Sequence, residues 1–170
     1  MQEIDSATMA DAGAIPTPPR VLIVDDNTSS RRLLAAALKS AGFTALQASD
    51  GSDALDAIAS VPPDVILLDL EMPGLNGTET CERIRAHADP RVRELPVVML
   101  TAHDSEEEEV RCLKAGANDF LAKPVGRAAL TARIQTQLRM RNFEMTCYYV
   151  APICPANSVV ELEWSARCGI

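Results

Sequence analysis

The sequence of 170 residues lacks an apolar run long enough to cross a bilayer, and its first 19 residues carry acids where a secretion signal carries bases. We therefore expect a cytoplasmic protein that does not insert into a membrane. Basic charge is also scarce, because 16 Lys and Arg face 24 Asp and Glu and the formal net charge is −8. This balance argues against direct binding of nucleic acid or of an anionic membrane, since both need a basic face.

Cysteine pairs of the CxxC type, typical of zinc sites and of thiol–disulfide exchange, are absent. The cysteine count is odd, and the spacings match no ligand pattern. The five positions are Cys81, Cys112, Cys147, Cys154 and Cys168. We expect reduced, structural thiols, as is usual in cytoplasmic proteins.

The length suits one domain of ordinary size with an extension at each end. Residues 1–19 are small and polar and end in Pro16-Thr17-Pro18-Pro19, which predicts a flexible leader. The domain itself is expected over residues 20–141. Residues 142–170 are interpreted as a tail of unknown order, too short for an effector domain. Its composition, with Cys147-Tyr148-Tyr149-Val150 and Val159-Val160-Glu161-Leu162-Glu163-Trp164, favours at most a strand or hairpin. Three origins stay open: a native appendix, the cut end of a longer protein, or a frame-shifted or vector-derived end.

A continuous apolar segment, Val65 to Leu68, is the centre of the predicted fold. It shows no polar alternation, which is typical of a parallel strand covered by helices on both faces. Strands are predicted over residues 20–26, 44–49, 65–70, 96–101 and 119–124. Helices are predicted from cap candidates at 28–30 to Gly42, over 52–58, over 77–87, from a cap at Asp104 or Ser105 to Gly116, and over 127–141. This alternation predicts an α/β fold with a doubly wound, five-stranded parallel sheet, (βα)5.

The spacing of apolar and charged residues predicts which face of a helix is buried and which is exposed to solvent. The first helix is expected to bury Leu33, Leu34, Ala37 and Leu38. The acidic run at 106–109 is interpreted as a solvated helix start, where the positive end of the helix dipole favours acids.

Polar groups follow four of the predicted strands. They are Asp25 and Asp26, Asp69, Thr101, and Lys123. Because the carboxyl ends of parallel strands lie at one edge of a sheet, we expect these groups to converge. Carboxylates packed together raise one another's pKa unless a cation neutralises them, and an all-oxygen ligand set suits Mg²⁺, or Mn²⁺.

A lysine and a hydroxyl beside a metal and a carboxylate form a place for a phosphoryl group. Lys123 and the metal would neutralise its charge, and Thr101 would donate a hydrogen bond. The nucleophile then has to be a carboxylate. Asp69 is the single one on the middle strand, whereas Asp25 and Asp26 are better placed to hold metal, so the expected product is an aspartyl phosphate at Asp69.

These residues resemble the receiver domain of bacterial two-component response regulators, the chemotaxis-protein type of flavodoxin-like fold. The resemblance covers residues 20–141. It is carried by Val21-Leu22-Ile23-Val24-Asp25-Asp26-Asn27, Asp69-Leu70-Glu71-Met72-Pro73-Gly74 with Gly77 following, Thr101-Ala102, and Lys123-Pro124.

The resemblance implies a role for each site residue. Asp69 would be the phosphoacceptor, and Asp26, Asp69 and the main-chain carbonyl of Glu71 would be Mg²⁺ ligands, with Asp25 acting mostly through metal-bound water. Lys123 would bind the phosphoryl oxygens. Thr101 would be the switch hydroxyl and Phe120 the switch aromatic. Glu71 and His103 would tune the phosphate lifetime, and the Lys123–Pro124 bond would be cis.

The resemblance further implies a phosphorylation-dependent switch whose donor is a sensor histidine kinase or a phosphotransfer protein, because no His here is placed as a phosphodonor. The output would be a change in the face built from the helix starting at 104 or 105, the strand 119–124 and the helix 127–141, acting on an unknown effector or through a homodimer. Such a domain catalyses only its own phosphorylation and dephosphorylation.

Two alternatives stay open. One is a regulatory part of a larger enzyme, such as a cyclic-dinucleotide synthase, a hydrolase or a phosphatase, and the other is a non-phosphorylated structural receiver. A flavin-binding protein is disfavoured, because Asp25-Asp26-Asn27 stands where a Gly/Ser/Thr-rich phosphate loop would be.

Overall fold

A computed structural model describes residues 17–102 and 105–150, with side chains up to Arg141. The chain divides into two compact units between Leu138 and Arg139, and the first contains the whole sheet. Among the described helices, none combines the length and the apolar character that a membrane span requires. Most of the predicted leader and most of the predicted tail lie outside the described residues.

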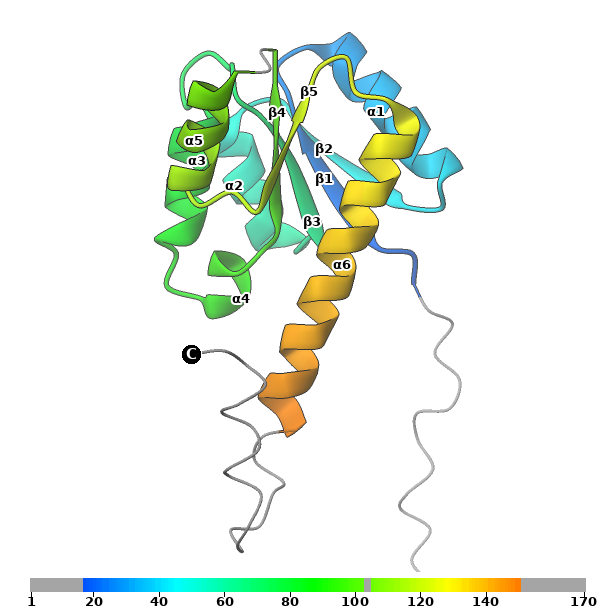
Figure 1. The fold of residues 1–170 in the computed structure, drawn as a ribbon, viewed down its shortest axis with the longest axis vertical. Coiled ribbons are helices and arrows are strands. Elements are labelled where there is room, and N and C mark those ends of the chain that lie inside the picture. Colours follow the sequence, from blue (N-terminus) through cyan, green and yellow to red (C-terminus); the bar gives the residue numbers. More distant parts are fainter. Residues whose placement is uncertain (1–16, 103–104, 151–170) are drawn as a thin grey trace, which may run out of the picture. The chain divides into compact units, whose positions relative to one another are not determined.

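Five parallel strands form one sheet in the order β2-β1-β3-β4-β5 (Figure 1). They are β1 (Arg20–Val24), β2 (Thr44–Ala48), β3 (Val65–Asp69), β4 (Val97–Thr101) and β5 (Asp119–Ala122). Each lies inside a predicted strand, so the doubly wound parallel fold is confirmed. The chain reverses its winding direction between β1 and β3, which are direct neighbours. The Lys123–Pro124 bond is cis, as the resemblance implied.

Helices connect the strands. They are α1 (Thr28–Ser40), α2 (Gly51–Ser60), α3 (Gly77–Arg85), α4 (Pro90–Arg93), α5 (Glu106–Lys114) and α6 (Arg127–Val150). The short α4, capped by Asp89, is not among the predicted helices, because a single turn is too short to show a helical period. The prediction of a cap at Ser105 is confirmed for α5.

The start of α1 differs from the prediction. Its N-cap is Asn27, whose side chain accepts hydrogen bonds from the backbone N–H groups of Ser29 and Ser30. Leu33 is 73% exposed, so its predicted burial is wrong. The buried face is rotated by one residue and consists of Leu34, Ala35 and Leu38.

Helix α6 extends to Val150, beyond the end predicted near Arg141. The expectation that the tail forms at most a strand or hairpin is therefore wrong for residues 142–150, and residues 151–170 lie outside the described residues. Aromatic and β-branched residues favour strands only weakly, whereas adding residues to an existing helix avoids the cost of a new nucleus.

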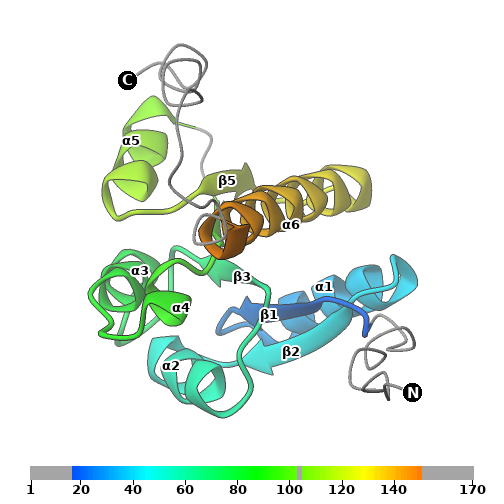
Figure 2. The same cartoon turned by 90° about the horizontal axis from the view of Figure 1, so that it is seen from below.

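Helices cover both faces of the sheet, as Figures 1 and 2 show. Side chains of α1 and α6 pack on one face, with Leu38 and Ile134 fully buried. Side chains of α2, α3 and α5 pack on the other, where Ile84 and Cys112 are fully buried. Burial raises the pKa of the Cys81 thiol to about 11, so this cysteine is held as an inert core residue.

Arg85, at the end of α3, donates hydrogen bonds to backbone carbonyl groups in several segments of the chain. Its guanidinium donates to the carbonyl oxygens of Gly116 at 2.8 Å, Arg93 at 2.7 Å and Leu95 at 2.8 Å. It also donates to the side-chain oxygen of Asn118 at 2.7 Å. These partners lie before β4 and β5, at the amino ends of the strands. Burial lowers the pKa of Arg85, although the group keeps all four bonds.

We predict that Arg85→Ala lowers the free energy of unfolding by about 2–4 kcal/mol, because it leaves half-buried carbonyls without a donor. Urea denaturation followed by circular dichroism measures the change. The matched control is Arg83→Ala in the same helix turn, which removes an exposed cation and is expected to cost under about 0.5 kcal/mol. Equal losses for the two variants would contradict this role of Arg85.

Candidate functional site

The groups predicted to converge come from adjacent strands. Asp25 directly follows β1, Asp69 ends β3, Thr101 ends β4, and Lys123 directly follows β5. Open α/β sheets bind ligands at the carboxyl edge where the winding direction changes, which is here the β1–β3 junction. Asp25 and Asp69 stand at that junction, and the former is 0% and the latter 5% exposed.

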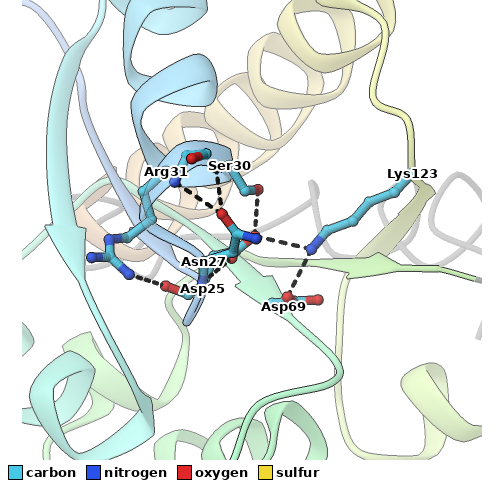
Figure 3. A network of polar contacts seen from close by, with 7 residues as sticks. Asp25, Asn27, Ser30, Arg31, Asp69 and Lys123 are labelled. Atoms are coloured by element: carbon cyan, nitrogen blue, oxygen red, sulfur yellow. Dashed lines mark hydrogen bonds and ion pairs between the residues drawn. The ribbon is translucent and has the colours of Figure 1, made fainter.

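Lys123 bridges the two buried carboxylates (Figure 3). Its Nζ lies 2.7 Å from Asp69 Oδ2 and 2.9 Å from Asp25 Oδ2. Burial by itself lowers the pKa of the lysine, but the hydrogen bonds and charges of the two acids outweigh it and leave the pKa raised. Lys123 is therefore held as an ammonium ion between two acids.

Burial acts on both acids in the same direction, but their other contacts give opposite net pKa shifts. Burial raises the pKa of Asp69, and the Lys123 bond only partly offsets this, while the charge of Asp25 adds to the rise. For Asp25, burial also acts upward, but hydrogen bonds from Ser30, Lys123 and Asn27 outweigh it and hold the pKa below its usual value. Asp25 is therefore the firmly ionised member of the pair, and Asp69 is the less stabilised carboxylate.

Two residues of the β1–α1 segment hold the Asp25 side chain. The hydroxyl of Ser30 donates to Oδ2 at 2.6 Å, and the backbone N–H of Asn27 donates to Oδ1 at 2.8 Å. Arg31 donates from the same helix turn to the main-chain oxygen of Asp25 at 2.5 Å. Figure 3 shows these groups around the end of β1. Asp25 is thus fixed from the start of α1.

Asp25, Asp26 and Asp69 form a cluster that fits a divalent cation. One ligand oxygen from each lies within 4.8 Å of the others, and only Asp26 is exposed. Carboxylate oxygens without nitrogen or sulfur donors are the set that Mg²⁺ prefers. The exposed Asp26 leaves one side of the cluster open to water, which Mg²⁺ usually retains.

Gly77 is required by close packing behind Asp69. A Cβ at this position would lie 2.3 Å from the carbonyl oxygen of Asp69 and 2.8 Å from the Cα of Leu70. Its N–H donates to the Leu70 carbonyl at 3.1 Å. The first residue of α3 therefore fixes the backbone that carries the acceptor candidate.

Thr101 is 2% exposed and its hydroxyl donates to the carboxylate of Glu108, in the first turn of α5. Thr101 follows Met99 by two positions and so points to the same sheet face, on which Phe120 packs as a partly buried ring. Thr101, Phe120 and α5 therefore share one side of the sheet.

The roles predicted for Glu71 and His103 stay predictions. Glu71 lies in the exposed loop after β3, and its backbone makes a hydrogen bond with the Asp69 side chain. Its carbonyl as a metal ligand and its effect on lifetime stay predictions. His103 lies outside the described residues.

Ser30 and Glu108 were not predicted to belong to the site. Their positions in the sequence could have indicated this, since each lies in the first turn of a helix that starts at the carboxyl edge of the sheet.

The family model described as "Response regulator receiver domain" matches residues 21–135. The chain belongs to this family. A response regulator MprA from Mycolicibacterium vanbaalenii is 43% identical over 122 residues, which is 72% of this chain and 51% of that protein. An MprA from Mycobacterium ulcerans is 42% identical over 125 residues, which is 74% of this chain and 52% of that protein. The chain thus spans about half the length of the curated relatives it matches.

Solved receiver structures show the same fold. A putative response regulator from Chloroflexus aurantiacus has a TM-score of 0.68 at 36% identity, covering 72% of this chain and 98% of that one. The chemotaxis protein CheY4 of Vibrio cholerae has a TM-score of 0.67 at 31% identity, covering 71% of this chain and 99% of that one. Receiver domains of this family belong to two-component signalling, and the acidic cluster of this receiver is compatible with Mg²⁺.

We predict that Ser30→Ala weakens Mg²⁺ binding about tenfold, because a carboxylate that has lost its orienting donor is a poorer support for the metal and its waters. Isothermal titration calorimetry with MgCl₂ measures the affinity. Ser29→Ala is the matched control, since that side chain is exposed in the same turn and is expected to leave the affinity unchanged. An unchanged affinity in Ser30→Ala would show that Asp25 does not depend on this bond.

Proposed function

We propose that this receiver accepts a phosphoryl group on Asp69 and acts as a phosphorylation-dependent signalling switch. The observation that carries the proposal is the Lys123 ammonium held 2.7 Å from Asp69 and 2.9 Å from Asp25, beside the cluster completed by Asp26. Asp69, the proposed nucleophile, thus has a cation and two further acids suited to a metal beside it, which supports the proposal.

The proposed donor is a phosphohistidine of a sensor histidine kinase or of a phosphotransfer protein. An Asp69 oxygen attacks phosphorus, an oxygen–phosphorus bond forms, and the nitrogen–phosphorus bond of the donor breaks, so that the electron pair returns to the imidazole. Lys123 moves from the carboxylates to the phosphoryl oxygens and neutralises their charge. Thr101 donates its hydroxyl hydrogen to another of these oxygens.

Asp25, Asp26, Asp69 and the Glu71 carbonyl are the proposed holders of Mg²⁺, or Mn²⁺, with Asp25 acting mostly through water. The bound metal supplies charge neutralisation of the transferring group. Water access to Asp69 from the loops carrying Glu71 and His103 would set the phosphate lifetime. Self-phosphorylation and self-dephosphorylation are the only catalysis proposed.

The proposed output is the face made by α5, β5 and the part of α6 up to Leu138. Thr101 and Phe120 lie on the sheet side that α5 covers, so a moved hydroxyl alters the packing of that ring and helix. The acidic run on α5 and the basic residues Arg127 and Arg133 on α6 favour complementary pairing in a homodimer or with an effector. Arg133 now pairs with Asp119 at 3.1 Å, a contact that such a partner would compete for. A cytoplasmic location accords with a kinase donor.

Incubation with acetyl phosphate and MgCl₂, followed by intact mass spectrometry, tests the proposal. The wild type is expected to gain one phosphoryl adduct that disappears when EDTA replaces the metal. Asp69→Asn is expected to gain none, because an amide is not a nucleophile for this reaction. Lys123→Ala is expected to react at least about tenfold more slowly, since it loses the cation beside the acceptor.

The matched control is Asp56→Asn, which removes the same charge from the exposed face of α2 and is expected to react like the wild type. A wild type that stays unmodified while folded would contradict the proposal and favour a structural receiver.

A further inference from the structure

Glu108 differs from its neighbours in the acidic run of α5. Glu106 and Glu107 are exposed and Glu109 is partly buried like Glu108, but it is the carboxylate of Glu108 that accepts the hydrogen bond of Thr101. The position of Glu108 is fixed by the helix start, because its backbone N–H bonds to the hydroxyl of Ser105 at 3.3 Å and to the carbonyl of Ser105 at 3.1 Å. The Glu108 side chain therefore extends from a capped helix turn to Thr101 at the edge of the sheet.

A hydroxyl group carries one hydrogen, and an ionised carboxylate is an acceptor only. In the contact with Glu108, Thr101 is thus the donor, and its single hydrogen is engaged. A phosphoryl group on Asp69 would need the same hydrogen. Thr101 is 2% exposed, so water has little access to the acceptor that loses the Thr101 hydroxyl. The two acceptors are mutually exclusive partners of one buried hydroxyl.

We propose that Glu108 is a positioning residue that acts through Thr101: it holds the hydroxyl in the unphosphorylated receiver and competes with the phosphoryl group for its hydrogen. This inference rests on the proposed function of Asp69. Formation of the aspartyl phosphate exchanges one acceptor for the other and releases the first turn of α5 from β4. The free energy of the Thr101–Glu108 bond therefore opposes the change in the α5 face, and the bond from Thr101 to the phosphoryl group has to exceed it.

Equilibrium binding of beryllofluoride, formed from BeCl₂ and NaF with MgCl₂ present, tests this inference on the full chain. Fluorine NMR of the bound species gives the affinity. Glu108→Ala is expected to bind the phosphoryl mimic about tenfold more tightly than the wild type, because Thr101 no longer has to leave a charged acceptor. Glu108→Gln keeps an uncharged acceptor and is expected to show a smaller gain, which also covers the case in which the alanine variant does not fold.

A double-mutant cycle separates action through Thr101 from simple charge repulsion. In a Thr101→Ala background, Glu108→Ala is expected to change the affinity by less than about twofold, since the shared hydrogen is already absent. A gain of equal size in both backgrounds would overturn the inference, because it would show that Glu108 acts on the anion directly. An unchanged affinity in both single Glu108 variants would overturn it as well.

The matched control is Glu106→Ala, which removes the same charge from the same helix turn without touching Thr101. It is expected to leave the affinity within about twofold of the wild type. A gain equal to that of Glu108→Ala would assign the effect to helix charge and overturn the inference. If the wild type binds beryllofluoride and only the Glu108 effect fails, the proposed function stands. If neither wild type nor variants bind, both fail together.

Discussion

The Lys123 ammonium between Asp25 and Asp69 is the interaction on which the site depends. Two buried carboxylates at the end of adjacent strands repel each other, and burial penalises both. Lys123 joins them through Oδ2 of each at 2.9 and 2.7 Å, so neither is left as an uncompensated buried charge. The Lys123 ammonium can also bind a phosphoryl group at Asp69, because the anionic oxygens of that group attract the same positive charge.

Contacts at both edges of the sheet support this arrangement. At the carboxyl edge, Gly77 allows α3 to start directly against the Asp69 backbone, where any Cβ would collide at 2.3 Å. At the amino ends, Arg85 satisfies carbonyl groups before β4 and β5. The positions of Thr101 and Lys123 are therefore determined by strands anchored away from the site. The proposed change in packing accordingly begins at the first turn of α5, whose Glu108 side chain contacts Thr101.

The sequence allowed the sheet and the convergence of its strand ends to be predicted, because buried parallel strands read as unbroken apolar runs and parallel topology brings their ends together. The contacts that helix side chains make with the rest of the domain were harder to predict. Ser30 looked like one of several cap candidates, but Asn27 caps α1 and frees the Ser30 hydroxyl for Asp25. Leu33 fitted the expected apolar stripe, yet a one-residue rotation leaves it exposed. Glu108 was one of four acids in a row, and only the three-dimensional placement of α5 distinguishes it.

Asp69, and no other acid of the cluster, is the proposed carrier of the phosphoryl group. Acyl phosphates are reduced by borohydride to the alcohol, so treatment of the phosphorylated chain followed by peptide mass mapping identifies the acceptor directly. We expect homoserine at position 69 and intact aspartate at positions 25 and 26. Reduction at Asp25 or Asp26, or at an acid outside the cluster, would contradict it.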